Sequence, residues 1–235
     1  MKILIMGANY NRRKIARICW KQLNETKNKK DEVIIWDDKT TEYDVKKEFK
    51  NIVFDYNLCL FSENIGIHQL RGLQIDAHSK LDNFFDGIYF TDSDAYHDPE
   101  WRKELDRLHK INPNAILCLY NTLHHAKLKD CGAHFEQQYC PGISMFLPIK
   151  MINQLSDNPK ILEMKSWDYD VSNMLGKPPV LCSKTSYVEH FGANSIHNSD
   201  FERDRAQNPT KYLRKRRDVI IRRITTLHNP DYIVA

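Results

Sequence analysis

Short apolar runs alternate with stretches of helical periodicity along the first half of the chain, and this alternation restricts the fold more than any other feature. Successive strands and helices in this order form a mostly parallel sheet with helices on its faces. The sequence therefore predicts an α/β fold. Asn11 is expected to cap the first helix. The expected strands are residues 2–7, 32–36, 57–61, 88–91 and 115–120, and the expected helices are residues 12–23, 44–50, 69–81 and 99–110.

The second half of the chain is less regular. We expect a strand or turn at 142–148, a short helix at 149–155, a helix at 167–175 and a strand at 180–182. No internal repeat or low-complexity linker divides the sequence. The prediction is one domain over residues 1–200, followed by a basic C-terminal extension, 201–235, that is mobile or extended.

The composition narrows the class of protein. The 235 residues are 41% hydrophobic and 28% charged, which is typical of a soluble globular chain. No apolar run approaches the roughly 20 residues of a membrane-spanning helix, and the apolar stretch Met1–Gly7 is too short for a signal peptide. The six cysteines lack Cys-x-x-Cys spacing, which argues against a zinc ribbon and for reduced thiols. A cytoplasmic protein is expected.

Four expected strands are followed by loops with unusual polar groups. Because the carboxyl ends of parallel strands meet at one edge of a sheet, these loops can share a ligand-binding crevice. Tyr10 can cover a base, and Asp38 can accept a hydrogen bond from a base or a ribose. Gly66 lets the backbone approach a ligand closely, and Arg71 can pair with a carboxylate or a phosphate. The loops are residues 8–12, 37–41, 63–66 and 92–94.

Asp92 and Asp94 stand one residue apart at the end of the fourth of these strands. Side chains alternate along a strand, so both carboxylates lie on one side of its end. Two hard oxygen ligands at this edge suit a divalent cation that carries phosphates. An isolated Asp-x-Asp pattern is weak evidence for a metal site, and the neighbouring polar loops strengthen it here.

In order and spacing, these loops resemble the strand-end motifs of glycosyltransferases with the GT-A fold, especially the family-2-like group. Lys39 and Gly72 differ from that pattern, which has Gly and Asn there. The resemblance implies a Rossmann-like, mixed and mostly parallel sheet, with a nucleotide-binding half at 1–100 and an acceptor half at 101–200. The matching motifs are Tyr10-Asn11-Arg12, Asp37-Asp38 with Thr40-Thr41, Asn64-Ile65-Gly66 with Arg71, and Asp92-Ser93-Asp94. The residues that it assigns to the donor nucleotide are Tyr10, Asn11, Asp38, Asn64, Gly66, Arg71 and Asp92.

The second half adds candidates for catalysis. The segment 166–171 is similar to the acidic helix start of the same family, although Trp167 replaces its Glu. The resemblance makes Asp168 the general base of an inverting transfer, with Asp170 as the alternative. Carboxylates at a helix N-terminus also serve as caps and dipole partners, and the residues alone leave both roles open.

A late segment, 187–195, resembles the family's His-x-Gly segment, in which a histidine completes the metal shell. The implied metal ligands are Asp94, Asp92 and His190, with His197 as the rival histidine. Imidazole beside carboxylates favours Mn²⁺, with Mg²⁺ as the alternative. The other histidines with no recognised ligand spacing are predicted to be surface or core residues, and they are His124, His125 and His134.

The resemblance implies an enzyme that moves a hexosyl or pentosyl group from a nucleoside-diphosphate sugar, UDP favoured, to a hydroxyl of a glycan or glycoconjugate. Three alternatives stay open: a glycosyltransferase acting on modified DNA bases, a sugar nucleotidyltransferase, and a non-catalytic nucleotide-sugar-binding module. Nucleotidyltransferases usually carry a Gly-rich loop after the first strand, whereas residues 7–11 hold one glycine. The polar segment 194–205 is a candidate lid over the diphosphate.

Basic residues crowd the C-terminal segment 211–223, and without them the rest of the chain is slightly acidic, because the formal net charge is +4. Three interpretations compete. The segment is a helix packed by its apolar face, a contact with an anionic membrane surface, or a contact with nucleic-acid phosphates. The cations are Lys211, Arg214, Lys215, Arg216, Arg217, Arg222 and Arg223.

Overall fold

A computed structural model describes residues 1–50, 57–78, 84–191 and 205–225. Its main sheet has nine strands among the described residues, in the order β3-β2-β1-β4-β9-β6-β10-β8-β7. The first four of these strands are parallel to one another, and β9 runs antiparallel between β4 and β6. The predicted mixed, mostly parallel sheet is therefore confirmed. The strands are β1 (Ile3–Asn9), β2 (Glu32–Asp37), β3 (Asn57–Leu60), β4 (Gly87–Asp92), β6 (Ile116–Cys118), β7 (Lys127–Asp130), β8 (His134–Gln137), β9 (Ser144–Pro148) and β10 (Val180–Ser183).

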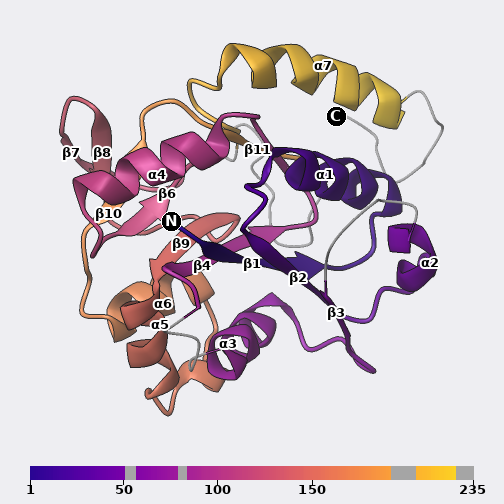
Figure 1. Cartoon of the computed structure of the whole chain (residues 1–235), viewed down its shortest axis with the longest axis horizontal. Coiled ribbons are helices and arrows are strands. Elements are labelled where there is room, and N and C mark those ends of the chain that lie inside the picture. Colours follow the sequence, from indigo (N-terminus) through magenta and orange to yellow (C-terminus); the bar gives the residue numbers. More distant parts are fainter. Residues whose placement is uncertain (51–56, 79–83, 192–204, 226–235) are drawn as a thin grey trace.

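Helices cover both faces of this sheet (Figure 1). One side carries α1, α4 and α7, and the other carries α3, α5 and α6. The expected helices all form, with ends that differ by a few residues from the sequence prediction. They are α1 (Arg13–Thr26), α2 (Val45–Lys50), α3 (Ile67–Ala77), α4 (Trp101–Ile111), α5 (Ile149–Ser156), α6 (Trp167–Met174) and α7 (Lys211–Thr225), with a 3-10 helix, η1, at Ile161–Glu163.

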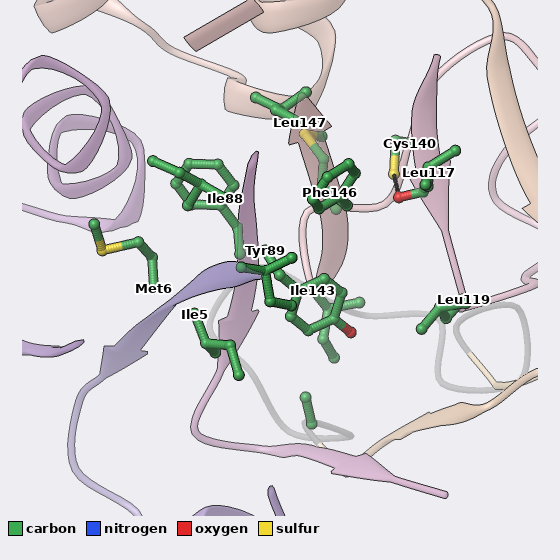
Figure 2. Packing of buried hydrophobic residues seen from close by; sticks show 14 of the residues in the cluster. Ile5, Met6, Ile88, Tyr89, Leu117, Leu119, Cys140, Ile143, Phe146 and Leu147 are labelled. Carbon is green, nitrogen blue, oxygen red and sulfur yellow. Dashed lines mark hydrogen bonds between the residues drawn. The ribbon is translucent and has the colours of Figure 1, made fainter. Parts of the chain in front are cut away.

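The central strands are buried on both faces, which explains why they appear in the sequence as continuous apolar runs. Every residue of β1 and of β9 is buried. Figure 2 shows Tyr89 and Phe146 packed among aliphatic side chains of neighbouring strands. Full burial of one such side chain stabilises the fold by about 1.5–3 kcal/mol. This core holds the sheet in place, and the polar loops follow the carboxyl ends of its parallel strands.

Two short strands and one hairpin were absent from the sequence prediction. The strands β5 (Ala95–His97) and β11 (Val188–His190) form a separate antiparallel pair. The hairpin β7–β8 extends the main sheet beyond β10. Both features are three or four residues per strand, too short for a detectable period.

The predicted N-cap of α1 is wrong. Arg12 takes the cap position with a left-handed φ of 58°, and no side chain caps the helix. Asn11 is also left-handed, with φ of 51°. Its Oδ1 accepts a hydrogen bond from the Thr41 N–H at 2.9 Å, so its side chain joins two loops instead of capping a helix.

The basic C-terminal segment forms α7, which packs on α1. Leu213 and Ile220 are buried in a cluster with Ile15 and Cys19 of α1. The packed-helix interpretation is thus confirmed for α7, and the expectation of a mobile or extended tail is wrong for this segment. Within the described ranges, no helix combines the length and the apolar character that a bilayer crossing demands.

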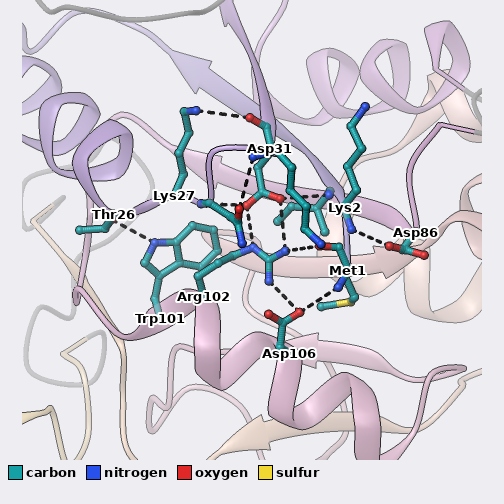
Figure 3. A network of polar contacts seen from close by, with 12 residues as sticks. Met1, Lys2, Thr26, Lys27, Asp31, Asp86, Trp101, Arg102 and Asp106 are labelled. Atoms are coloured by element: carbon teal, nitrogen blue, oxygen red, sulfur yellow. Dashed lines mark hydrogen bonds and ion pairs between the residues drawn. The ribbon is translucent and has the colours of Figure 1, made fainter.

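A buried ion pair joins α4 to the start of the sheet (Figure 3). The Arg102 guanidinium donates to both carboxylate oxygens of Asp31, at 2.7 and 3.2 Å, and to the Met1 carbonyl at 2.9 Å. The side chains of Arg102 and Asp31 are 6% and 0% exposed. Asp31 also accepts from the Ile3 N–H at 3.2 Å, so one carboxylate ties together β1, β2 and α4.

Removing Arg102 should destabilise the protein strongly, because Asp31 would remain as an unpaired buried charge. For Arg102→Met we expect the free energy of unfolding to fall by about 3–5 kcal/mol, measured by urea denaturation. Lys103→Ala on the same helix removes only a surface pair with Glu100 and should change it by less than about 0.5 kcal/mol. Equal, small losses in both variants would contradict the structural role of the pair.

Candidate active site

The strand-end loops do meet at one edge of the sheet. The register places Asn9 beside Asp37 and Ala8 beside Asp92, so β1, β2 and β4 end at the same level. A hydrogen bond from the Ser93 N–H to the Ala8 carbonyl, at 2.9 Å, continues this alignment past the end of β4. The convergence expected from a parallel sheet is present in the structure.

Asp94 and His190 lie side by side at this edge, although 95 positions separate them in the chain. His190 Nε2 is 3.3 Å from Asp94 Oδ2. The pairing of β5 with β11 causes this, because it sets Ala95 opposite His190, and the Phe191 N–H donates to the Asp94 carbonyl at 3.0 Å. The structure therefore brings together two of the three predicted metal ligands.

Asp94 is mostly buried and is held by two basic groups. Arg12 Nη1 donates to Asp94 Oδ2 at 2.7 Å, beside His190. Burial by itself raises the pKa of the Asp94 carboxyl, but His190 and Arg12 outweigh burial and lower the pKa to about 2. The carboxylate is therefore charged throughout the physiological pH range and can bind a cation.

Asp92, the third predicted ligand, faces a different partner. Its Oδ1 accepts a hydrogen bond from Arg71 Nη2 at 2.5 Å. Burial raises the pKa of Asp92, as does the nearby Asp94 charge, whereas Arg71 and His190 lower it. The Asp92 side chain keeps 29% of its surface exposed, so it can still reach a bound ligand.

Arg71 is fully buried, with no exposed side-chain surface. Besides Asp92, it donates to the carbonyls of Met6 and Thr91, at 3.1 and 2.8 Å. Of the two partners expected from the sequence, a carboxylate or a phosphate, the structure shows the carboxylate. Arg71 therefore holds the Asp92 side chain from the protein interior.

Asp38 closes the loop that follows β3. Its two carboxylate oxygens accept from the backbone N–H groups of Ile65 and Gly66, at 2.7 and 2.9 Å, and Asn64 Nδ2 donates to the Asp38 carbonyl at 3.1 Å. Gly66 has a φ of 80°, where a side chain would be strained. Three residues assigned to the donor by resemblance are thus joined in one clamp.

Asn9 organises the floor of the site, although it has no predicted role beyond its place in the polar loop 8–12. Its Nδ2 lies 2.6 Å from Asp37 Oδ1 and 3.1 Å from both Thr40 Oγ1 and the Tyr43 hydroxyl oxygen. Trp20 Nε1 donates to its Oδ1 at 3.2 Å. A lone Asn at the end of an otherwise apolar strand was the available signal.

Tyr10 is 41% exposed at the rim of this edge, so its ring is accessible to a ligand. His197 and all of the candidate lid 194–205 except Arg205 lie outside the described residues.

On α6, the two predicted catalytic carboxylates have different surroundings. Asp170 Oδ2 accepts from the backbone N–H groups of Lys165 and Ser166, at 2.8 and 2.9 Å, so this side chain reaches back to the two residues that precede the helix. Asp168 Oδ2 lies 3.9 Å from His125 Nε2, while its Oδ1 accepts from the Tyr169 N–H at 3.0 Å. His125, predicted to be an ordinary surface or core residue, is the neighbour of the predicted base.

No protein-family model matches the chain, and no curated protein matches its sequence. Solved structures do match it. S. aureus TarS 1-349 in complex with UDP-GlcNAc aligns with a TM-score of 0.57 and 15% identity, over 86% of this chain and 63% of its own. Mannosyltransferase PcManGT from Pyrobaculum calidifontis, in complex with GDP-Man and Mn²⁺, gives 0.57 and 12% over 77% and 56%.

GalNAc-T7 with UDP, GalNAc and Mn²⁺ aligns with a TM-score of 0.60 and 8% identity, over 78% of this chain and 42% of its own. This chain spans 36–63% of the length of the matched TarS chains. The family-2 assignment stays a prediction. At these identities the likeness concerns the fold, and the chain has the GT-A fold of glycosyltransferases that its strand-end loops predicted.

Proposed function

We propose that this chain is a metal-dependent glycosyltransferase that moves a sugar from a nucleoside-diphosphate sugar to a hydroxyl of a glycan or glycoconjugate. The observation that carries the proposal is the Asp94–His190 pair at the ligand-binding edge of a GT-A sheet. The similar structures hold UDP-GlcNAc, GDP-Man, or UDP with GalNAc. UDP occurs in more of them than GDP, which supports the preference for a uridine donor.

The residues at this edge fit a divalent cation. Asp94 offers a charged oxygen and His190 a nitrogen 3.3 Å away, and neither side chain is fully covered. A mixed oxygen and nitrogen set suits Mn²⁺, with Mg²⁺ as the alternative. A bound cation supplies Lewis-acid neutralisation of the leaving diphosphate. Asp92 is the third residue of this site. It would bind the cation directly, or contact the ribose and a water molecule on the cation.

The loop of Tyr10, Asn11 and Arg12 receives the nucleotide in this proposal. The exposed ring of Tyr10 can stack on the base. Arg12 pairs with Asp94, and a guanidinium is also the group best shaped for bidentate contact with phosphate. The Asp38 clamp fixes the loop that contains Asn64 and Gly66, and in this proposal these two residues contact the ribose and the diphosphate.

We infer that Asp168 is the general base of an inverting transfer. An acceptor hydroxyl becomes a good nucleophile when a carboxylate within hydrogen-bond reach takes its proton. His125, 3.9 Å from Asp168, can stabilise the ionised form that accepts the proton. Asp170 is the weaker candidate, because its Oδ2 already accepts from two backbone N–H groups that precede the helix.

Replacing Asp94 tests the metal and the reaction together. With Mn²⁺ and a panel of nucleotide sugars, the native chain should release free nucleoside diphosphate, detected by mass spectrometry. Asp94→Asn should weaken Mn²⁺-dependent donor binding by at least about tenfold, whereas Asp157→Asn at the exposed end of α5 should not. Unchanged binding in Asp94→Asn would refute the metal assignment, and pyrophosphate release would indicate a nucleotidyltransferase instead.

Replacing Asp168 tests the base. Asp168→Asn should reduce kcat by about 10²–10⁴-fold with donor affinity almost unchanged. The matched control is Asp170→Ala two residues along, which removes the oxygen that accepts from the Lys165 and Ser166 N–H groups. It should lower the free energy of unfolding by about 0.5–2 kcal/mol but retain turnover per folded molecule. Equal losses of kcat and donor affinity in Asp168→Asn would point to a structural role and reopen the possibility of a binding module.

The packed helices α1 and α7 together present a cationic face. Their buried sides meet through Ile15, Cys19 and Leu213, and most of their basic residues are exposed. Arg217 instead pairs with Glu189, and Arg13 and Arg17 pair with Glu48. Val219 is exposed among these cations, and a mixed cationic and apolar surface is typical of helices that lie on membranes. We propose contact with an anionic membrane surface near a lipid-linked acceptor. The exposed cations are Arg13, Lys14, Arg17, Lys21, Lys211, Arg214, Lys215 and Arg216.

Charge reversal tests this face. Lys211→Glu with Lys215→Glu should weaken co-sedimentation with anionic vesicles by at least about tenfold, at roughly 1 kcal/mol per cation. Neutral vesicles should bind neither form, and Lys29→Glu with Lys30→Glu, also exposed but beyond the end of α1, should bind like the native chain. Salt-sensitive binding to duplex DNA without vesicle binding would favour a nucleic-acid acceptor and overturn the membrane proposal.

A further inference from the structure

The hairpin β7–β8 gathers a thiol, an imidazole and a carboxylate at the far edge of the main sheet. One ligand atom from each of Cys131, His134 and Glu136 lies within 4.8 Å of the other two. Cys131 Sγ is 3.5 Å from Glu136 Oε1. We propose that these three residues form a zinc site, separate from the Asp94–His190 pair and independent of the glycosyltransferase proposal.

The local backbone explains why the three residues meet. The Cys131 N–H donates to the His134 carbonyl at 2.9 Å, which closes the turn between the two strands. Gly132 has a φ of 77° and allows the chain to reverse there. His134 and Glu136 are two positions apart on β8, so their side chains lie on the same face of the strand. Cys131 stands across the turn from both.

Other contacts hold this turn in place before any ion binds. Asp130 Oδ1 accepts from the Gly132 N–H at 2.8 Å and pairs with Lys184 at 2.5 Å. Arg107 of α4 donates to the Ala133 carbonyl at 3.0 Å. The turn is therefore tied to β10 and α4, and the three ligand residues need only side-chain adjustment to bind an ion.

His134 provides a second, independent indication of a ligand. The residue is only 8% exposed, and its Nδ1 is buried without a hydrogen-bond partner among the described residues. Leaving a buried polar atom unpaired is unfavourable. A cation bound at Nδ1 would remove that cost.

The donor set selects the metal. Thiolate, imidazole and carboxylate are the three ligand types that zinc uses, usually in tetrahedral geometry, and a water molecule can take the fourth position. A thiolate is a poor ligand for Mg²⁺ and Ca²⁺, which prefer oxygen. The Asp94–His190 pair contains no sulfur, so the two sites differ in chemistry and can be titrated separately.

A zinc ion here would stabilise a part of the sheet that has little apolar packing. All four residues of β7 are exposed, so this edge strand depends on its backbone pairing with β8. The chain leaving β8 reaches Tyr139, whose ring packs on Tyr169 of α6 at 4.9 Å. The site would therefore restrain a segment that contacts the helix carrying Asp168.

Cobalt titration tests the proposal on the full chain after removal of metal by chelation. Tetrahedral Co²⁺ with a thiolate ligand gives visible bands and a sulfur-to-metal charge-transfer band, and Zn²⁺ should abolish both by competition. Cys131→Ser should remove the charge-transfer band and weaken Zn²⁺ binding by at least about tenfold. His134→Gln should weaken Zn²⁺ binding similarly while the thiol remains.

Two controls make the result specific. Cys59→Ser, at another partly exposed thiol, and Asp94→Asn, at the proposed catalytic metal, should both keep the sulfur-to-metal charge-transfer band of the native chain. Far-ultraviolet circular dichroism shows whether each variant is folded. A sulfur-to-metal charge-transfer band that survives Cys131→Ser, or the absence of stoichiometric Zn²⁺ binding to the native chain, would overturn the proposal whatever the outcome for sugar transfer.

Discussion

Buried carboxylates at the carboxyl edge of the sheet determine how the site is built. Asp38 and Asp94 are both classed among the buried residues of the chain, and removing a lone carboxylate from water costs several kcal/mol. Each must therefore find compensating donors. Asp38 accepts hydrogen bonds from the Ile65 and Gly66 N–H groups. Asp94 pairs with Arg12 and His190. The loops take their shapes from these requirements.

The sequence predicted the regular framework because its signals are local. The strand β1 and the helices α1 and α4 have strong apolar patterns, and their order alone indicates a mostly parallel sheet. The partnership of Asp94 with His190 was expected only through resemblance, since the strands β5 and β11 that create it have three residues each. His125 was missed because its neighbour Asp168 is close only in the folded chain. His134 was missed although Cys131 and Glu136 lie within three positions of it, because their spacing matches no metal-ligand pattern that was recognised in the sequence.

Two of the three departures from the glycosyltransferase pattern, Lys39 and Gly72, have local structural explanations. Lys39 adopts a φ of 61°, which costs about 1–2 kcal/mol for a residue with a side chain. Asp37 offsets this, because it accepts from the Thr40 N–H and hydroxyl at 2.9 and 2.5 Å. At Gly72 a Cβ atom would lie 2.4 Å from the Ile161 carbonyl oxygen, so η1 can approach α3 only beside glycine. Both differences are compatible with the fold.

Trp167, which stands where the similar family has Glu, connects the two halves of the proposed site. Its ring lies 5.3 Å from the Arg71 guanidinium and packs edge-on against Phe90 of β4. Arg71 in turn holds Asp92, while Trp167 is the first residue of the helix that carries Asp168. Asp92, assigned to the donor, and the helix that carries Asp168, assigned to the acceptor, thus both contact the same buried arginine. Because Arg71 has no exposed surface and both of its Nη groups donate hydrogen bonds, a shift of α6 or of the end of β4 would disturb the packing around the same side chain.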